Sequence, residues 1–313
     1  MLPIAPLRRS DARLYQIASL ALLLAYGMAA LSFDVAPARA ALLLGTALAS
    51  QLGFSRLARL AAFDPWSALI SGLSLCLLLR TPSALLAVAA AVITIGSKFA
   101  LRWNGKHLFN PTNFGLVAML AAGADVWVSP GQWGSAVILA FLIVCAGRFV
   151  VHRAARADVT LAFLATYAAL LFARALAVHD PWTIPAHRLQ SGAILLFAFF
   201  MISDPKTTPD SRIARILFGA AVALGAAYIQ LRIFRPNGAV WSLALCSLLV
   251  PLLDLLLPGR RSPAGVAPFV SKGDFHAPLI DLRRRPAPVR ALSRFPGPRL
   301  LRLLRGQGGR EAL

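Results

Sequence analysis

A succession of apolar segments of bilayer-spanning length constrains this chain more than any other feature. A helix needs about 20 mostly apolar residues to cross the hydrocarbon core of a membrane, with a range of roughly 17 to 25. With 58% hydrophobic and only 14% charged residues, the chain is not an ordinary soluble domain. We therefore expect an all-α, polytopic integral membrane protein with about ten transmembrane helices. The expected spans are Leu14–Phe33, Pro37–Phe54, Trp66–Leu79, Ala84–Leu101, Asn113–Val128, Trp133–Val151, Val159–Val178, Ser191–Ser203, Ile213–Leu231 and Ala239–Leu257.

Basic residues at the ends of these segments predict the orientation. The basic clusters before the first segment and after each even-numbered one fall on a single face. Because basic loops stay in the cytoplasm, both termini are predicted to be cytoplasmic. This placement also explains the formal net charge of +20, so we expect no nucleic-acid partner. The opposite face carries fewer arginines, spread over five connections: Arg39, Arg80, Arg174, Arg188, Arg232 and Arg235.

Paired motifs relate the two halves of the apolar region. Asp-Pro-Trp at 64–66 precedes Ser-Gly in the third segment, and the same tripeptide at 180–182 precedes Ser-Gly in the eighth. Because each unit holds five segments, an odd number, the second unit must enter the membrane inverted. The sequence predicts two inverted five-helix repeats, at about 14–128 and 133–257.

The chain changes character after Leu257. We divide it into a ten-span membrane domain, 1–257, and a tail, 258–313, that is rich in arginine and proline. The composition predicts a largely disordered cytoplasmic extension whose basic piece around Arg294–Arg305 rests on anionic lipid. The alternative is a solvated tail that only reinforces the topology.

A polar island over Ser97–Gly115 separates the fourth and fifth segments. Asn110 is placed to cap a helix that begins at Pro111, because proline suits the first helical position and its missing N–H would be unpaired there anyway. The N-terminus of that helix offers free N–H groups and a positive dipole end to an anion or polar ligand.

A second polar island, Met201–Ser211, ends the eighth segment at the same predicted face. The two islands can jointly hold a polar cofactor or mark an ion entry, unless Asp204 and its neighbours are only turn and capping residues. Asp254 lies among apolar residues of the tenth segment, where an acid is costly unless it is paired or reaches water. Asp204 and Asp254 are our candidates for ion or proton handling.

Other familiar sites lack their residues. Cys76, Cys145 and Cys246 stand singly in apolar segments, which excludes zinc and iron–sulfur ligand sets. The sequence holds no Gly-rich phosphate loop, GxSxG elbow or HExxH motif. We therefore expect no metal site and no complete active site of the chain's own.

Three stretches, in order, resemble the signatures of the NqrB/RnfD membrane family. They are Ser97-Lys98 with Phe109–Gly115, then Phe199–Pro209, then Pro251–Asp254. The resemblance implies a flavin-carrying subunit of a bacterial inner-membrane electron-transport complex, with other membrane and peripheral subunits as partners. In that family the redox steps are linked to sodium or proton movement. The asparagine-rich first motif is also similar to the shorter UnbU-like proteins of enediyne biosynthesis clusters.

One departure changes the cofactor that the resemblance implies. Family members with covalent FMN attach it through a phosphoester to the threonine of a Ser-Gly-Ala-Thr-type motif, whereas the only Ser-Gly-Ala of this chain, 191–193, is followed by Ile194. A covalent flavin is therefore not expected, and FMN or riboflavin would bind noncovalently at the first island. Asparagine side chains would supply hydrogen bonds, threonine a weaker contact, and the basic residues a counter-charge for a phosphate or a reduced flavin. These residues are Asn110, Asn113, Thr112, Lys98 and Arg102.

Two other functions are compatible with the same fold. A secondary transporter would use the inverted repeats and short spans to enclose a solute site, and it would purify colourless. A non-redox scaffold subunit would anchor a partner through the tail, so that deleting 258–313 would remove the partner alone. A bound chromophore separates the redox function from both.

Overall fold

The computed structural model describes residues 2–4, 11–30, 33–129 and 156–259, all within one compact unit. The sixth expected span, Trp133–Val151, and residues 260–313 of the tail lie outside the described residues. In chain order the elements are α1 (Ala12–Ala30), α2 (Pro37–Leu57), α3 (Pro65–Leu78), β1 (Leu79–Arg80), α4 (Ala84–Ala100), β2 (Arg102–Trp103), β3 (Lys106–His107), α5 (Pro111–Ala121), β4 (Trp127–Val128), α7 (Ala157–Val178), α8 (Thr183–Leu189), α9 (Gly192–Leu196), the π-helical turn η1 (Phe197–Met201), α10 (Arg212–Leu231), α11 (Gly238–Ser247) and α12 (Val250–Leu256).

The described residues form an all-α, polytopic membrane protein. Helices α1, α2, α7 and α10 are long and apolar enough to cross a bilayer. Two bent pairs meet the same test, α8 with α9 and η1 at 47° and α11 with α12 at 49°, which gives up to six such spans in the described part. Helices α3, α4 and α5 are apolar but shorter.

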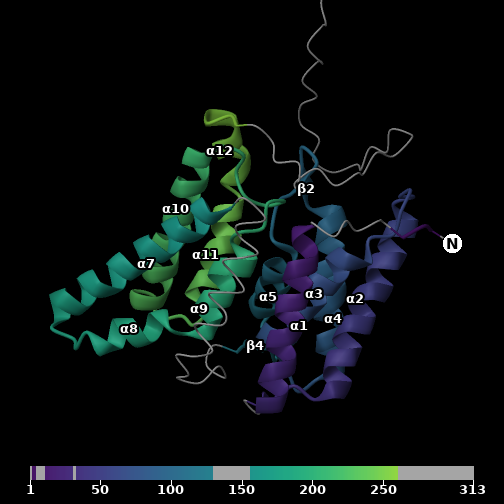
Figure 1. Ribbon diagram of the computed structural model, residues 1–313, viewed down its shortest axis with the longest axis horizontal. Coiled ribbons are helices and arrows are strands. Elements are labelled where there is room, and N and C mark those ends of the chain that lie inside the picture. The colour runs from purple at the N-terminus through teal and green to yellow at the C-terminus, as the bar shows by residue number, and fades with distance from the viewer. Residues whose placement is uncertain (1, 5–10, 31–32, 130–155, 260–313) are drawn as a thin grey trace, which may run out of the picture. The chain divides into compact units, whose positions relative to one another are not determined.

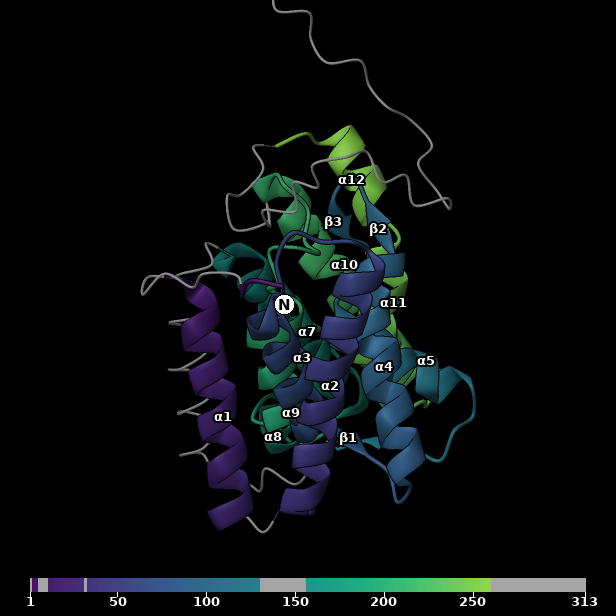
Figure 2. The same ribbon diagram turned by 90° about the vertical axis from the view of Figure 1, so that its right-hand side faces the viewer.

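Helices of the first half pack in a layer in which α1 and α2 contact α3, α2 contacts α4, and α4 contacts α5 (Figure 2). In the second half α10 packs against α7 and α11 (Figure 1). Close approach requires glycine at α10, because a Cβ at Gly219 would lie 2.7 Å from the Val159 carbonyl oxygen. Helices α5 and α11 contact each other and so join the halves.

Two short antiparallel strand pairs mark opposite ends of the bundle (Figure 2). Strands β2 and β3 form a hairpin at the end that holds both polar islands, with Arg102 opposite His107. At the other end β1 pairs with β4, with Leu79 opposite Val128, and ties the end of α3 to the segment after α5.

Most expected spans agree with the helices to within a few residues, but the fifth and tenth were wrong in part. The fifth was expected to reach Val128, whereas α5 ends at Ala121 because Gly123 adopts a positive φ of 68° and the chain then forms β4. The tenth is broken between Ser247 and Val250, where the next turn begins with Pro251, which has no N–H to continue the helix.

Candidate functional site

Asn110 fixes the start of α5 and also connects the two polar islands. Its Oδ1 accepts a hydrogen bond from the Asn113 backbone N–H at 3.1 Å, and Pro111 follows in the first turn. The expected cap is therefore confirmed. The Asn110 Nδ2 donates to the Met201 carbonyl oxygen at 3.3 Å. This contact places the first island against the second, as their shared face predicted.

The Met201 carbonyl belongs to an irregular turn that the sequence did not reveal. From Phe197 to Met201 the helix widens to a π-helical turn, in which the Ile202 N–H bonds to the Phe197 carbonyl oxygen at 3.0 Å. The Ser203 hydroxyl donates to the Phe199 carbonyl oxygen. Single π turns occur frequently at functional sites, because they release backbone groups from the regular ladder.

The side chain of Asn113 is the least satisfied polar group of the site. Asn113 is 0% exposed, and neither its amide nitrogen nor its amide oxygen has a hydrogen-bond partner. Thr94 and Thr208 are also fully buried, each with an unpartnered hydroxyl, and Thr112 is 4% exposed. A buried polar group without a partner costs roughly 1–3 kcal/mol. Such groups indicate a missing ligand, ion or water molecule.

The apolar-flanked Asp254 has a partner in the first island. Its Oδ2 lies 2.8 Å from the Lys106 Nζ, which also lies 2.7 Å from the Asp210 Oδ1 and donates to the Thr208 carbonyl oxygen at 3.3 Å. The second oxygen of Asp254 accepts the Asp210 N–H at 2.7 Å. Sequence reasoning missed Lys106, although a buried acid needs a partner and this lysine lies in the facing island.

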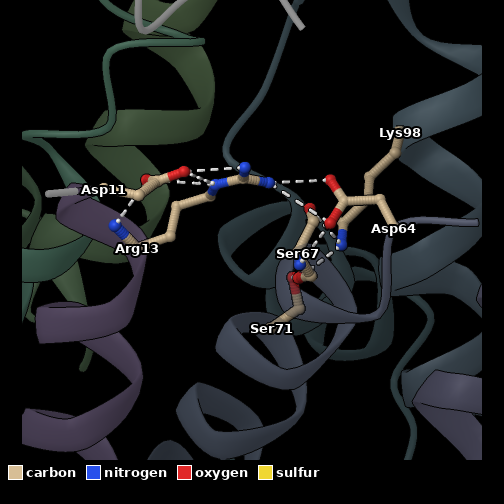
Figure 3. A network of polar contacts seen from close by, with 6 residues as sticks. All are labelled: Asp11, Arg13, Asp64, Ser67, Ser71 and Lys98. Carbon is tan, nitrogen blue, oxygen red and sulfur yellow. Dashed lines mark hydrogen bonds and ion pairs between the residues drawn. The ribbon is translucent and has the colours of Figure 1, made fainter. Parts of the chain in front are cut away.

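Lys98 belongs to a second network, which joins α1, α3 and α4 (Figure 3). The Arg13 guanidinium lies between Asp11, at 2.8 Å, and Asp64, at 3.1 Å. Asp64 caps α3 by accepting the Ser67 N–H at 3.4 Å. The buried Lys98 Nζ donates to the carbonyl and hydroxyl oxygens of Ser67 at 2.8 and 3.1 Å. The expected ligand residue Lys98 therefore has protein partners already.

Other cations on the same side of the bundle are less well neutralised. Burial lowers the pKa of the Lys206 ammonium, while the Asp64 and Asp204 carboxylates oppose that shift. Burial likewise lowers the pKa of the Arg102 guanidinium. Burial, and then the charges of Lys206 and Arg102, hold the pKa of His107 well below 6.5, so this histidine is neutral at pH 7. The island side thus has an excess of positive charge suited to an anion.

Asp204 has a local role in the structure. Its Oδ1 accepts the Lys206 N–H at 2.9 Å, and its carbonyl oxygen accepts the N–H groups of Thr207 and Thr208. These are the bonds of a turn, the ordinary alternative considered for this residue. Within the described ranges, no three His, Cys, Asp or Glu side chains are grouped as a metal site requires.

A family model described as NQR2, RnfD, RnfE family matches residues 122–261. The chain belongs to this family. The matched segment contains the second island and Asp254 and begins after Asn110 and Asn113. Membership therefore rests on the second half of the membrane region, and the first island is a feature of this chain to be tested by itself.

Curated relatives within the family are named as a subunit of the ion-translocating oxidoreductase complex. The protein of Tolumonas auensis is 41% identical over 75 residues, which are 23% of this chain and 21% of the relative. That of Cronobacter sakazakii is 31% identical over 151 residues, 48% and 41% of the two chains. That of Escherichia coli O1:K1 is 34% identical over 103 residues, 33% and 29%. The chain thus spans less than half the length of the curated relatives it matches.

Proposed function

We propose that this chain is the membrane subunit of an Rnf/Nqr-type electron-transport complex in a bacterial inner membrane. It binds FMN or riboflavin noncovalently at the first island, passes electrons across or along the membrane, and is coupled to the movement of Na⁺ or H⁺. The observation that carries the proposal is the fully buried Asn113 amide, of which neither polar atom is paired.

The donor set at the first island suits a flavin. The pyrimidine edge of a flavin presents both hydrogen-bond donors and acceptors, and the Asn113 amide offers one of each. Arg102 and Lys206 supply the positive charge that an FMN phosphate requires, with Thr112 as a weaker contact. Asn110 contributes by holding the start of α5 against Met201. A bound flavin supplies the redox chemistry, and the protein supplies binding and orientation.

The packing supports the proposed inverted repeats. The contact of α2 with α4 has its counterpart in that of α7 with α10, and the contact of α4 with α5 in that of α10 with α11. Helix α5 begins at the island end, because it follows the β2–β3 hairpin, whereas α11 begins at the far end, because α10 starts beside the second island. We propose ten spans, in which the described helices are joined by 133–151, and two cytoplasmic termini.

The pair of Asp254 and Lys106 is our site for ion or proton handling. Asp254 lies in the last turn of the membrane region and shares the Lys106 ammonium with Asp210. A carboxylate that is held by a lysine can take up a proton or cation when the ion pair opens. Asp204 acts there indirectly, because it shapes the turn that carries Asp210. The complex's other subunits are the proposed partners, and the basic tail would rest on anionic lipid.

The visible absorption spectrum of the full-length protein in detergent, taken before and after acid precipitation, tests the flavin. We expect a yellow band that leaves with the supernatant. Asn113→Leu should remove the band while the protein still inserts and remains folded. A matched control is Gln51→Leu, which replaces another buried amide, in α2, whose oxygen is unpartnered. This variant should retain the flavin.

Each other outcome contradicts a stated part of the proposal. A band that stays with the pellet would mean a covalent flavin, and an unchanged band in Asn113→Leu would move the site away from the first island. A colourless wild-type protein, purified together with its partner subunits, would favour the transporter or the scaffold. Deleting 258–313 then separates those two, because only the scaffold should lose its partner.

A further inference from the structure

A cavity of about 280 Å³ lies at the end of the bundle opposite the polar islands. It is enclosed by the start of α2, the β1 strand, the start of α4 and β4, and two arginines line it, Arg39 and Arg80. Figure 2 shows β1 at this end, far from the β2–β3 hairpin. The cavity is therefore separate from the site proposed for the flavin.

Arg80 is anchored with its guanidinium in the cavity wall. The residue is 5% exposed, and its Nη1 donates to the carbonyl oxygens of Cys76 and Leu79 at 2.9 and 2.8 Å. Carbonyl oxygens fix the direction of the guanidinium without neutralising its charge. Burial lowers the pKa of Arg80, and the Asp34 carboxylate, also in the cavity wall, opposes that shift. Asp34 therefore balances one of the two cavity charges.

Arg39 carries the second charge and has no acid beside it. Its Nη2 donates to the Pro82 carbonyl oxygen at 3.0 Å, which ties α2 to the turn before α4. Its Nη1 is buried and has no hydrogen-bond partner, and no carboxylate of the described residues lies within ion-pair distance. A buried guanidinium N–H without an acceptor is costly, so this group indicates an anion in the cavity.

The surroundings indicate which anion. Two guanidinium groups from different elements present the forked donors that phosphate oxygens accept. The α2 N-terminus adds its positive dipole end, because Ala36 precedes it without a side-chain cap. Trp127, 47% exposed, forms part of the rim, as expected where a protein meets the lipid headgroups. Lipid phosphates lie at this depth of a bilayer.

We propose that Arg39 and Arg80 bind a phosphate group in this cavity. The face in question has few arginines, and two of its six line this one cavity. Orientation signals alone would not place two cations in one partly apolar cavity. The phosphate belongs either to an anionic phospholipid or to a free phosphate, and the test distinguishes these sources.

The test measures the thermal unfolding midpoint of the full-length protein in detergent after addition of phosphatidylglycerol, phosphatidylcholine or inorganic phosphate. We expect phosphatidylglycerol to raise the midpoint more than phosphatidylcholine does. Arg39→Ala should weaken phosphatidylglycerol binding about tenfold, since a hydrogen bond to a charged group contributes roughly 1.5–3 kcal/mol. Native mass spectrometry should show the matching loss of the retained lipid.

Arg235→Ala is the matched control, because it removes an exposed arginine from the connection between α10 and α11. It should leave the effect of phosphatidylglycerol unchanged, as should the lipid bound by the tail. Stabilisation by inorganic phosphate that Arg39→Ala abolishes would support the site with a free phosphate as its ligand. If Arg39→Ala and Arg80→Gln both bind phosphatidylglycerol and phosphate as the wild type does, the proposal is overturned. Equal effects of the two lipids, with none from phosphate, would also overturn it.

Discussion

Lys106 and Asp254 form an ion pair of 2.8 Å although 148 residues separate them in the sequence. The lysine lies on the hairpin that follows the fourth helix, and the aspartate lies in α12, the last described helix. Asp210, at 2.7 Å from the same ammonium, adds the second island to the cluster. One cation therefore holds together three segments that the sequence suggested only as neighbours on one face.

Lys106→Met is expected to destabilise the protein more than Asp254→Asn does. Removal of the lysine leaves two partly buried carboxylates without a counter-charge, which should cost about 3 kcal/mol, whereas Lys106 keeps Asp210 when Asp254 is replaced and the cost should be about 1–2 kcal/mol. Denaturant titration in detergent measures the free energy of unfolding. Asp180→Asn, which breaks the more exposed pair with Arg174, is the control and should cost at most about 1 kcal/mol. Equal losses in all three variants would contradict the cluster.

Asn110→Ser and Asn110→Ala separate the two roles of Asn110. Serine can still accept the N–H of the first turn, so it should lose only the bond to the Met201 carbonyl oxygen, about 1 kcal/mol of stability. Alanine loses the cap as well and should cost about 2 kcal/mol or more. The thermal unfolding midpoints should therefore fall in the order wild type, Ser, Ala. Equal midpoints for the two variants would mean that the cap contributes nothing.

Local signals in the sequence sufficed for the helix starts of the first half. Pro37, Asp64-Pro65 and Asn110-Pro111 were readable because a cap and an N-terminal proline act within one turn. The breaks inside the eighth and tenth spans were not readable, because continuous apolar composition does not distinguish a straight helix from a bent one. The π turn at Phe197–Met201 depends on contacts such as the Thr160 hydroxyl bond to the Ala198 carbonyl oxygen, which no local pattern contains.

The site was predictable in its parts but not in its pairings. The chemistry of Asp254 required a partner, yet only the fold selects Lys106 over the other basic residues of the island. Lys98 was expected to face a ligand and instead donates to Ser67. Asn113 was expected to bind, and its unpartnered amide is consistent with that role, which remains a prediction.

Stability should fall with pH below about 6.5 in a manner that depends on His107. The folded protein holds the pKa of this histidine well below 6.5, the value for an unperturbed side chain. The unfolded chain therefore binds the proton more readily, so stability is full above pH 6.5 and is lost as the pH falls towards the folded pKa. His107→Gln should reduce the drop in unfolding midpoint between pH 7.5 and about 5. His187→Gln, an exposed histidine on α8, should leave the drop unchanged, and an identical drop in His107→Gln would refute the assignment.

Gly115 and Thr94 should show strong energetic coupling, because α5 crosses α4 where these two residues meet. A Cβ at Gly115 would collide with the Thr94 hydroxyl and would lie 3.3 Å from the Ala90 carbonyl oxygen. Gly115→Ala should therefore cost about 1–3 kcal/mol by overpacking. Thr94→Ala removes the colliding group, and its own hydroxyl has no hydrogen-bond partner, so that variant alone should cost little. The double variant should then recover at least half of the loss, which a double-mutant cycle of unfolding free energies measures directly. Additive losses would mean that the clash is with the α4 backbone and that the threonine does not set the distance between the helices.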